Sequence, residues 1–310
     1  MKHSKILFAL MAGCFIIVAC KDVDFKKTKG GMPYKLYPGK GTKKAAKGSF
    51  LKAAYTQKVN DSVLYKSYGK VPVYIAVTDA TDPYSPTELF GELKVGDSLV
   101  TIQMVDTFIK RNPMMVPPPF KNGDRIISTF KILDILPDQA AYMNDLKKEE
   151  EALLQREQSR IQQYLQKNNI NAVKTEKGVF VQVSNAGEGE PIDSGKYVMV
   201  KYRGKTFAGK VFDTNMDTSF HHTDPIGITI GQGGSIPGFE EGLKALKKGG
   251  RGVVYIPSML AYGSSPPPGS NIPPFADLIF ELEIVDVKNS APPVVRVPLQ
   301  QNVDTIQQHQ

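Results

Sequence analysis

The sequence predicts an α+β protein in which antiparallel strands dominate and one fold is present twice. Three observations lead to this prediction. Glycine (27 residues) and proline (22 residues) are abundant in the 310-residue chain, which favours short strands and turns over a helical bundle. Segments of alternating apolar and polar residues, typical of half-buried strands, recur in both halves. Short motifs also recur in the same order about 150 residues apart.

Residues 1–19 have the pattern of a secretory signal peptide. Lys2 and Lys5 precede an apolar run that is too short to span a bilayer comfortably. The sequence IVAC at 17–20 resembles a bacterial lipobox, which implies cleavage after residue 19 and a lipid-modified Cys20. An ordinary signal peptide and a retained anchor helix are the alternatives. Cys20 would be the only cysteine of the mature chain, so no intramolecular disulfide is expected.

These features predict a protein that is lipid-anchored in the bacterial cell envelope, on the periplasmic side or at the cell surface. Residues 20–30 are polar and charged, and we expect them to form a tether. The formal charge is +8, but basic residues are mixed with acids, as in KKEEE at 147–151. This mixing favours a solvated surface over nucleic-acid binding, so no nucleic-acid partner is predicted.

The first predicted domain covers residues 31–137. Alternating segments predict strands within 32–41, 50–59, 71–77, 93–105 and 125–136, and a proline at the start of PTELFGEL predicts a short helix over 86–93.

Three segments of this domain resemble later ones. LKVGDSLVTI at 93–102 resembles LKKGGRGVVYI at 246–256, PPF occurs at 118–120 and 273–275, and FKILDI at 130–135 resembles LEIVDV at 282–287. The shared order predicts one fold present twice. Coincidence among common turn and strand motifs is the alternative.

Residues 138–175 are charged and predict a helical linker. The segment is rich in strong helix formers, Asp138 is a suitable N-cap, and Asn168 with Asn169 suits the end of the helix. Its intermittent apolar stripe is interrupted by Glu150 and Glu157 and lacks sustained heptads. We therefore favour a helix that lies partly against a neighbouring domain, and a dimerising coiled coil is the alternative.

The second predicted domain covers residues 176–288. Strands are predicted within 177–190, 196–205, 209–214, 224–231, 251–257 and 276–287. A short helix is predicted over 237–243, because a proline opens it, acids follow in its first turn and lysines follow its end.

The motifs of this domain occur in a distinctive order. They are VKYRG at 200–204, VFDT at 211–214, IPGFEEGL at 236–243, AYG at 261–263, IPP at 272–274 and ELEIVDV at 281–287. In this order they resemble the FK506-binding-protein (FKBP) family of peptidyl-prolyl cis-trans isomerases. The resemblance implies an antiparallel, twisted half-barrel wrapped around the short helix, with an apolar pocket between sheet and helix.

The resemblance also implies the site residues. Carried over position by position, the catalytic residues are Phe212, Asp213 and Tyr262, and the substrate-binding residues are Tyr202, Ile226, Ile228, Ser235, Ile236, Phe239, Ile272 and Phe280. Three positions depart from the usual pattern of the family. Phe239 replaces a tryptophan, Ile226 a phenylalanine and Ser235 a valine, so the pocket is expected to be less aromatic or less apolar.

The implied activity is cis–trans isomerisation of X-Pro bonds during the folding of exported envelope proteins. It needs no cofactor and no metal. The implied partners are proline-containing unfolded or exported polypeptides, and a macrolide is a candidate ligand. The adjacent His221 and His222 are interpreted as a solvated loop, because no further metal ligands accompany them. The alternative function is a non-catalytic peptide-binding chaperone or scaffold.

The first domain is expected to be a degenerate copy. Tyr55 corresponds to Tyr202, but its sequence contains no counterpart to Phe212-Asp213 or to Ala261-Tyr262-Gly263. We therefore expect it to bind clients or partners without catalysis. Residues 289–310 have no clear periodicity and are predicted to be a disordered tail.

Overall fold

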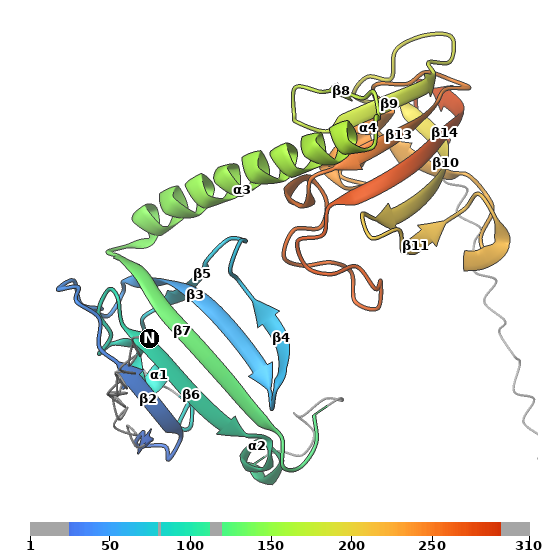
Figure 1. The fold of residues 1–310 in the computed structure, drawn as a ribbon. Coiled ribbons are helices and arrows are strands. Elements are labelled where there is room, and N and C mark those ends of the chain that lie inside the picture. The colour runs from blue at the N-terminus through green and yellow to red at the C-terminus, as the bar shows by residue number, and fades with distance from the viewer. Residues whose placement is uncertain (1–24, 80–81, 112–119, 293–310) are drawn as a thin grey trace, which may run out of the picture. The chain divides into compact units, whose positions relative to one another are not determined.

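The computed structural model describes residues 25–79, 82–111 and 120–292. The chain divides into two compact units. Unit 1 is the chain up to Tyr68 with Pro72–Met143, and unit 2 is Asn144 onward with Gly69–Val71. Each unit contains a seven-stranded antiparallel sheet and short helices (Figure 1). The predicted α+β class is confirmed.

Unit 1 arranges its strands in the order β1-β2-β6-β7-β3-β4, and β5 also pairs with β3. The strands are β1 Lys26–Lys27, β2 Pro33–Tyr37, β3 Phe50–Val59, β4 Ser62–Lys66, β5 Val73–Ala76, β6 Ser98–Met104 and β7 Arg125–Leu136. The helices are α1 Thr87–Phe90 and α2 Val105–Arg111. The sequence predicted β2, β3, β5, β6, β7 and α1, but it missed β1, β4 and α2.

Unit 2 arranges its strands in the order β8-β9-β13-β14-β10-β11, and β12 also pairs with β10. The strands are β8 Val173–Lys174, β9 Phe180–Asn185, β10 Tyr197–Thr206, β11 Val211–Thr214, β12 Ile226–Thr229, β13 Arg251–Ile256 and β14 Leu278–Lys288. The helix α4 spans Pro237–Leu243, and the 3-10 turns η2 and η3 span Thr218–Phe220 and Ser258–Leu260. Strand for strand, this is the order of unit 1, so the predicted repeat is confirmed.

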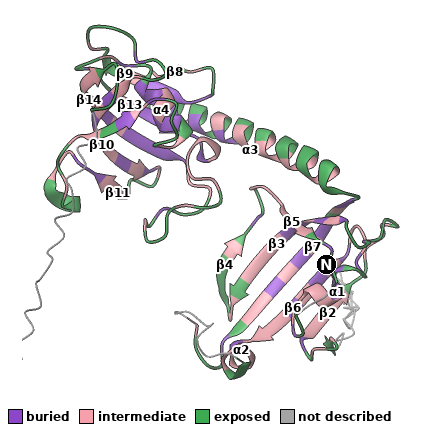
Figure 2. Cartoon of the chain, turned by 180° about the vertical axis from the view of Figure 1, so that it is seen from behind, coloured by how far each residue is buried: buried purple, intermediate pink, exposed green. Residues whose placement is uncertain are grey.

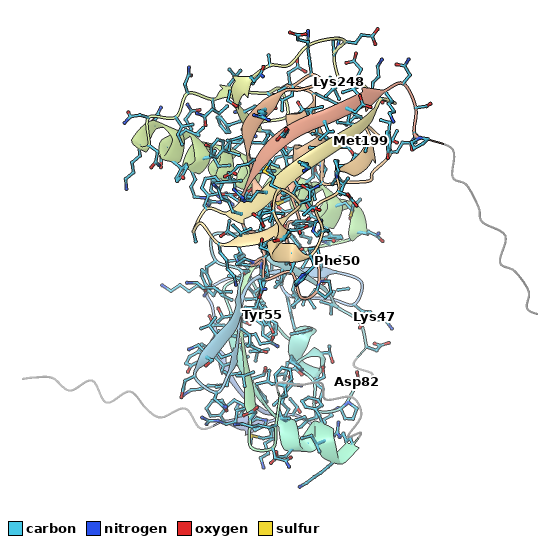
Figure 3. The ribbon with its side chains drawn as sticks, turned by 90° about the vertical axis from the view of Figure 1, so that its right-hand side faces the viewer. Lys47, Phe50, Tyr55, Asp82, Met199 and Lys248 are labelled. Atoms are coloured by element: carbon cyan, nitrogen blue, oxygen red, sulfur yellow. The ribbon has the colours of Figure 1, made fainter. Side chains whose placement is uncertain are left out.

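The two sheets also share two irregularities, while a third, in the β13–β9 pairing between Arg251 and Gly252, occurs in unit 2 without a counterpart in the β2–β6 pairing. The β3–β7 pairing shifts register between Lys52 and Ala53, and the β10–β14 pairing shifts between Met199 and Val200. A second shift lies between Gln57 and Lys58 in one unit and between Gly204 and Lys205 in the other. Counting from these shifts, Tyr55 occupies the position of Tyr202, as predicted (Tyr55 and Met199 are labelled in Figure 3).

A backbone turn is repeated at the same register. In unit 1 the Gly96 amide donates to the Ile132 carbonyl, and in unit 2 the Gly249 amide donates to the Ile284 carbonyl, both at 2.9 Å. The recurrence of LKVGDSLVTI in LKKGGRGVVYI therefore reflects a shared turn and strand.

Each sheet packs one face against its short helix, and buried residues alternate along the central strands (Figure 2). In unit 2 the approach of α4 to β13 depends on Gly238, since a Cβ there would lie 2.2 Å from the Ile256 side chain. The glycine at this position of α4 thus permits the close packing of the helix on the sheet.

The helix α3 spans Gln139–Lys167 and begins as predicted (green in Figure 1). The Ala141 amide donates to the Asp138 carboxylate at 2.8 Å, and Asn169 adopts a left-handed conformation at the other end. Its buried side chains in unit 2 are Leu153, Glu157, Ile161 and Leu165. The expected packing of the helix against a domain is confirmed.

The C-terminal part of α3 covers the outer face of the second sheet. Ile161 and Leu165 pack against Phe180, Tyr255 and Ile279, whose neighbours in sequence face α4 on the other side. Burial of each such apolar side chain stabilises the fold by about 1.5–3 kcal/mol. Glu157, which we expected to interrupt the apolar stripe, is 1% exposed and lies inside it.

Two predicted boundaries need correction. β1 lies in the predicted tether and pairs with β2, and β8 lies in the predicted linker and pairs with β9. The predicted signal peptide, Cys20 and the part of the predicted tail beyond residue 292 lie outside the described residues. Within the described ranges, no helix has the length and apolar character needed to cross a membrane.

Candidate functional site

The predicted site residues come from several elements of unit 2. The strands carry six of them: Tyr202 on β10, Phe212 and Asp213 on β11, Ile226 and Ile228 on β12, and Phe280 on β14. Ile236 precedes α4 and Phe239 lies in it, while Tyr262 and Ile272 lie between β13 and β14. All except Asp213 and Ser235 belong to the main apolar cluster of the unit or pack against it. Chain segments about 80 residues apart are therefore joined in one site.

Three aromatic rings form the base of this cluster. The Phe239 ring lies 5.0 Å from that of Phe280 and 5.9 Å from that of Tyr202, both nearly perpendicular. Such edge-to-face contacts are favourable because the positive ring edge meets the negative face. All three side chains are buried, whereas Phe212 and Tyr262 are partly exposed above them. The arrangement is an apolar floor with an accessible rim.

Gly204 allows Phe212 to lie across β10. A Cβ at Gly204 would come within 2.6 Å of the Phe212 ring and 2.9 Å of the Phe280 ring. The Phe212 and Phe280 rings themselves meet edge to face with centroids 5.6 Å apart. The glycine of the VKYRG motif is therefore required by close side-chain packing.

Asp213 is held at the rim by hydrogen bonds to both carboxylate oxygens. The Tyr202 hydroxyl donates to Oδ2, and Nε2 of His222 lies 2.9 Å from Oδ1. Burial, together with this bond to Asp213, raises the pKa of Tyr202, so its hydroxyl remains a donor. His221 is exposed, as expected for a solvated loop, and the His222 side chain is 41% exposed but also contacts Asp213.

Asn215 supports this arrangement from below, and the sequence reasoning missed it. Its side chain is fully buried, accepts from the Tyr202 amide at 2.6 Å and donates to the carbonyls of Val200 and Asp224. It therefore ties β10 to the end of β11 and to the start of β12. The available signal was a lone asparagine directly after VFDT.

Tyr262 is positioned by a turn that depends on α3. The Glu157 carboxylate accepts from the Ser258 hydroxyl and, at 3.1 Å, from the Met259 amide. Asp277 accepts from the Ser258 amide at 3.0 Å and from Arg160 at 2.5 and 2.8 Å. This network fixes η3, which leads directly into Tyr262.

The environments of these carboxyl and hydroxyl groups affect their protonation. Burial raises the pKa of Glu157 and that of Asp277, although hydrogen bonds from Ser258 and Arg160 oppose the effect. Burial and the nearby Asp213 raise the pKa of Tyr262, so its hydroxyl also remains a donor. Both hydroxyls of the site can donate hydrogen bonds at neutral pH.

Ser235 differs from the other predicted residues. Its hydroxyl donates to the Glu240 carboxylate at 3.4 Å, and that carboxylate also accepts from the Gly231 amide at 2.9 Å. It stabilises the turn before α4 rather than joining the apolar cluster. Across the described ranges, no group of three or more His, Cys, Asp or Glu side chains is placed to hold a metal ion.

Comparison with known proteins agrees with the motifs. Residues 188–285 match the sequence profile of the family described as FKBP-type peptidyl-prolyl cis-trans isomerase. FkpA, an FKBP-type peptidyl-prolyl cis-trans isomerase of Escherichia coli K12, is 42% identical over 117 residues, which are 37% of this chain and 40% of FkpA. The chain thus spans less than half of that relative.

Two further proteins are similar to parts of the chain. The crystal structure of FkpA from Escherichia coli aligns with a TM-score of 0.37 and 32% identity, covering 48% of this chain and 69% of that one. The FK506-binding protein of Neisseria meningitidis serogroup B is 36% identical over 110 residues, which are 36% of this chain and 96% of that protein. Because nearly the whole of that relative is matched, the chain belongs to the FKBP-type peptidyl-prolyl cis-trans isomerase family.

Proposed function

We propose that unit 2 catalyses cis–trans isomerisation of X-Pro bonds in exported polypeptides. The observation that carries this proposal is the Asp213 carboxylate, which is held by Tyr202 beside the aromatic floor of Phe239 and Phe280. An apolar surface with one fixed negative charge and a few donors at its rim suits an uncharged, proline-containing segment.

The physical argument starts from the amide bond. Rotation breaks amide resonance and has a barrier of about 18–20 kcal/mol. The planar amide is more dipolar than the twisted one, so an apolar site that excludes water disfavours the planar state. The proline ring would lie on Phe212, Phe239 and Ile236. Isomerisation in either direction then needs only binding and orientation of the peptide.

The polar rim would orient the twisted amide. The Tyr262 hydroxyl and the Ile236 amide would bind peptide carbonyls, and Asp213 would act on the rotating carbonyl or its neighbours through its charge. No covalent bond is formed or broken in this scheme. The departures at Phe239, Ile226 and Ser235 leave the rings of the floor in contact, so we propose that they tune affinity for substrates and macrolides.

The test is isomerisation of a proline tetrapeptide by the chain from residue 25 onward. This form keeps α3, whose Glu157 and Arg160 hold η3, whereas a fragment starting at residue 175 would lack them. We expect acceleration above background, a large loss in Asp213→Ala and a smaller loss in Tyr262→Phe. No acceleration by the unmutated chain would refute the enzymatic proposal.

A second candidate function is client binding without catalysis in unit 1. Val63, Leu64 and Tyr68 are 55%, 52% and 55% exposed on or next to the edge strand β4. Unpaired edge strands with apolar side chains can bind extended peptides by adding a strand. We expect residues 31–137 alone to show no isomerase activity, and Val63→Ser with Leu64→Ser to weaken suppression of client aggregation.

The cellular setting belongs to the same proposal. We propose that Cys20 carries a lipid and that the two units act in the cell envelope, on exported proteins. Support comes from the IVAC sequence at 17–20 and the preceding apolar run. In Cys20→Ser we expect loss of acyl labelling and release from the membrane fraction. Retention in the membrane with labelling unchanged would disprove the anchor.

A further inference from the structure

His222 makes a specific contact with the site. Its Nε2 lies 2.9 Å from Oδ1 of Asp213, and the Tyr202 hydroxyl donates to Oδ2 of the same carboxylate. The Tyr202 and His222 ring centroids are 6.5 Å apart. Two side chains from different segments, β10 and the loop after η2, therefore fix the orientation of one carboxylate.

The loop that carries His222 is held at several points. Asp217 accepts from the Ser219 amide at 2.9 Å and from Arg203 at 2.9 Å, which anchors the start of η2 to β10. His221 then adopts a left-handed conformation with φ of 60°. Asn215 donates to the Asp224 carbonyl at 3.0 Å and closes the loop. The place of His222 is thus determined by the fold around it.

Other ionisable groups surround this pair. Tyr202 and Tyr262 have pKa values raised by burial, so both stay neutral and can donate. Asp217 forms an ion pair with Arg203. His221 and Asp224 lie in the same loop and are exposed. Of these groups, Tyr202 and His222 are the ones for which the structure gives a hydrogen bond to the Asp213 carboxylate.

We propose that His222 is a positioning residue that orients the Asp213 carboxylate toward the substrate. The proposal rests on the proposed isomerase function. The Nε2–H group of His222 donates to Oδ1, while the Tyr202 hydroxyl donates to Oδ2. Together the two donors fix the plane of the carboxylate.

This role has a consequence for the rate of the reaction. Loss of the His222 contact leaves the Asp213 carboxylate held by Tyr202 at Oδ2 but without its partner at Oδ1, so kcat/KM should fall. Because the two side chains are 41% and 37% exposed, solvent screens the contact. We therefore expect a decrease of about two- to fivefold.

The test compares variants of the chain from residue 25 onward in the tetrapeptide assay. His222→Ala removes the donor, so kcat/KM should fall by this factor. His222→Gln supplies an amide donor at a similar reach, so it should restore most of that activity. His221→Ala is the matched control from the same loop, and it should keep the activity of the unmutated chain.

A second measurement does not depend on activity. Nitrogen-15 NMR of the neutral histidines should show the Nε2–H tautomer for His222, and Asp213→Ala should remove this preference. An Nδ1–H tautomer, or full activity in His222→Ala, would overturn the proposal while leaving the isomerase function standing. An inactive unmutated chain would overturn both together.

Discussion

Units 1 and 2 share their strand order and two register shifts, and Tyr55 matches Tyr202, yet they differ at several other positions that would touch a substrate. By register, Leu64 and Tyr65 of β4 occupy the positions of Phe212 and Asp213 of β11. Gln57 stands at the position of Gly204, where a side chain would occupy the place of the Phe212 ring. The same fold thus persists without the carboxylate and without the space for the aromatic rim.

The interior beneath these positions differs as well. Ser128 of β7 stands at the position of Phe280, and Thr101 of β6 stands at that of Val254. The Tyr55 hydroxyl lies 3.1 Å from the Ser128 hydroxyl, whereas Tyr202 reaches Asp213 at the rim. α2 follows β6 where η3 and Tyr262 follow β13. Backbone pairing and core burial therefore specify the fold, and a few side chains specify the site.

The largest effect is expected when unit 2 receives the residue of unit 1 at the Phe280 position. Phe280→Ser removes the ring that contacts Tyr202, Phe212 and Phe239. We expect a loss of about 3–5 kcal/mol in the free energy of unfolding of unit 2, together with loss of isomerase activity. Urea unfolding and the tetrapeptide assay measure the two. Phe220→Ser, at an exposed aromatic of the η2 turn, should change stability by no more than about 0.5 kcal/mol.

The second-largest effect is expected when the contact of α3 with η3 is removed, and it should be confined to the stability of unit 2. Glu157→Ala leaves the Ser258 hydroxyl and the Met259 amide without their acceptor, so we expect a loss of about 2–3 kcal/mol. Hydrogen exchange should show weaker protection in η3 and unchanged protection in unit 1. Equal loosening of both units would contradict this prediction.

The protonation state of Glu157 adds a pH-dependent comparison to the same experiment. Burial raises its pKa in the folded state, so its contribution to stability is greatest at low pH and decreases as pH rises through that pKa. Glu157→Gln resembles the protonated form. It should therefore cost much less than Glu157→Ala at pH 7, and its stability should depend less on pH near this range.

A stabilising effect is expected in unit 1. The Thr101 hydroxyl is buried and, in the part of the chain that the structure describes, has no hydrogen-bond partner. Val254 occupies the equivalent position in unit 2. Thr101→Val should therefore stabilise unit 1 by about 1 kcal/mol, because the unpaired hydroxyl is removed at nearly constant volume. Thermal unfolding of residues 25–143, which include β1 and Tyr142, measures it, and destabilisation would contradict the prediction.

The smallest effect concerns the η2 loop, which belongs to unit 2. Hydrogen bonds from the hydroxyl and amide of Ser219, and then from Arg203, lower the pKa of Asp217 from 3.8 to about 2. A lowered pKa means that its contribution is present above pH 3.8 and is lost as pH falls through about 2. Amide exchange at Ser219 should therefore accelerate only in this acidic window. In Asp217→Asn this acid-dependent step should be absent.

Much of the fold was predictable because its determinants are local. The alternation in FLKAAYTQKV predicts β3 directly, and the proline, acids and lysines around 237–248 predict α4. β4 was missed because SVLYK is an edge strand whose side chains are mostly exposed, so its apolar alternation carries no burial signal. α2 was missed because a seven-residue helix directly after a strand has no cap of its own in the sequence.

The site was predictable only in part. Phe212, Asp213, Phe239 and Tyr262 lie in motifs with a known order, so a resemblance identifies them. Asn215, Glu157 and His222 act through partners that are 13, 101 and 9 residues away along the chain, and nothing in the sequence specifies these pairs. For Glu157 the sequence even predicts exposure, since an isolated carboxylate in an apolar stripe normally faces solvent.

The sequence by itself determined the class of fold, its duplication, the charged helix between the copies and the family of the second copy. These depend on periodicity, turn residues and motif order, which are properties of contiguous segments. Only the tertiary structure decided that α3 covers the second sheet, that η3 rests on Glu157, and that Asp213 is shared by Tyr202 and His222. Such contacts join residues distant in sequence, and they form only once hydrogen bonding and burial have fixed the strands in register.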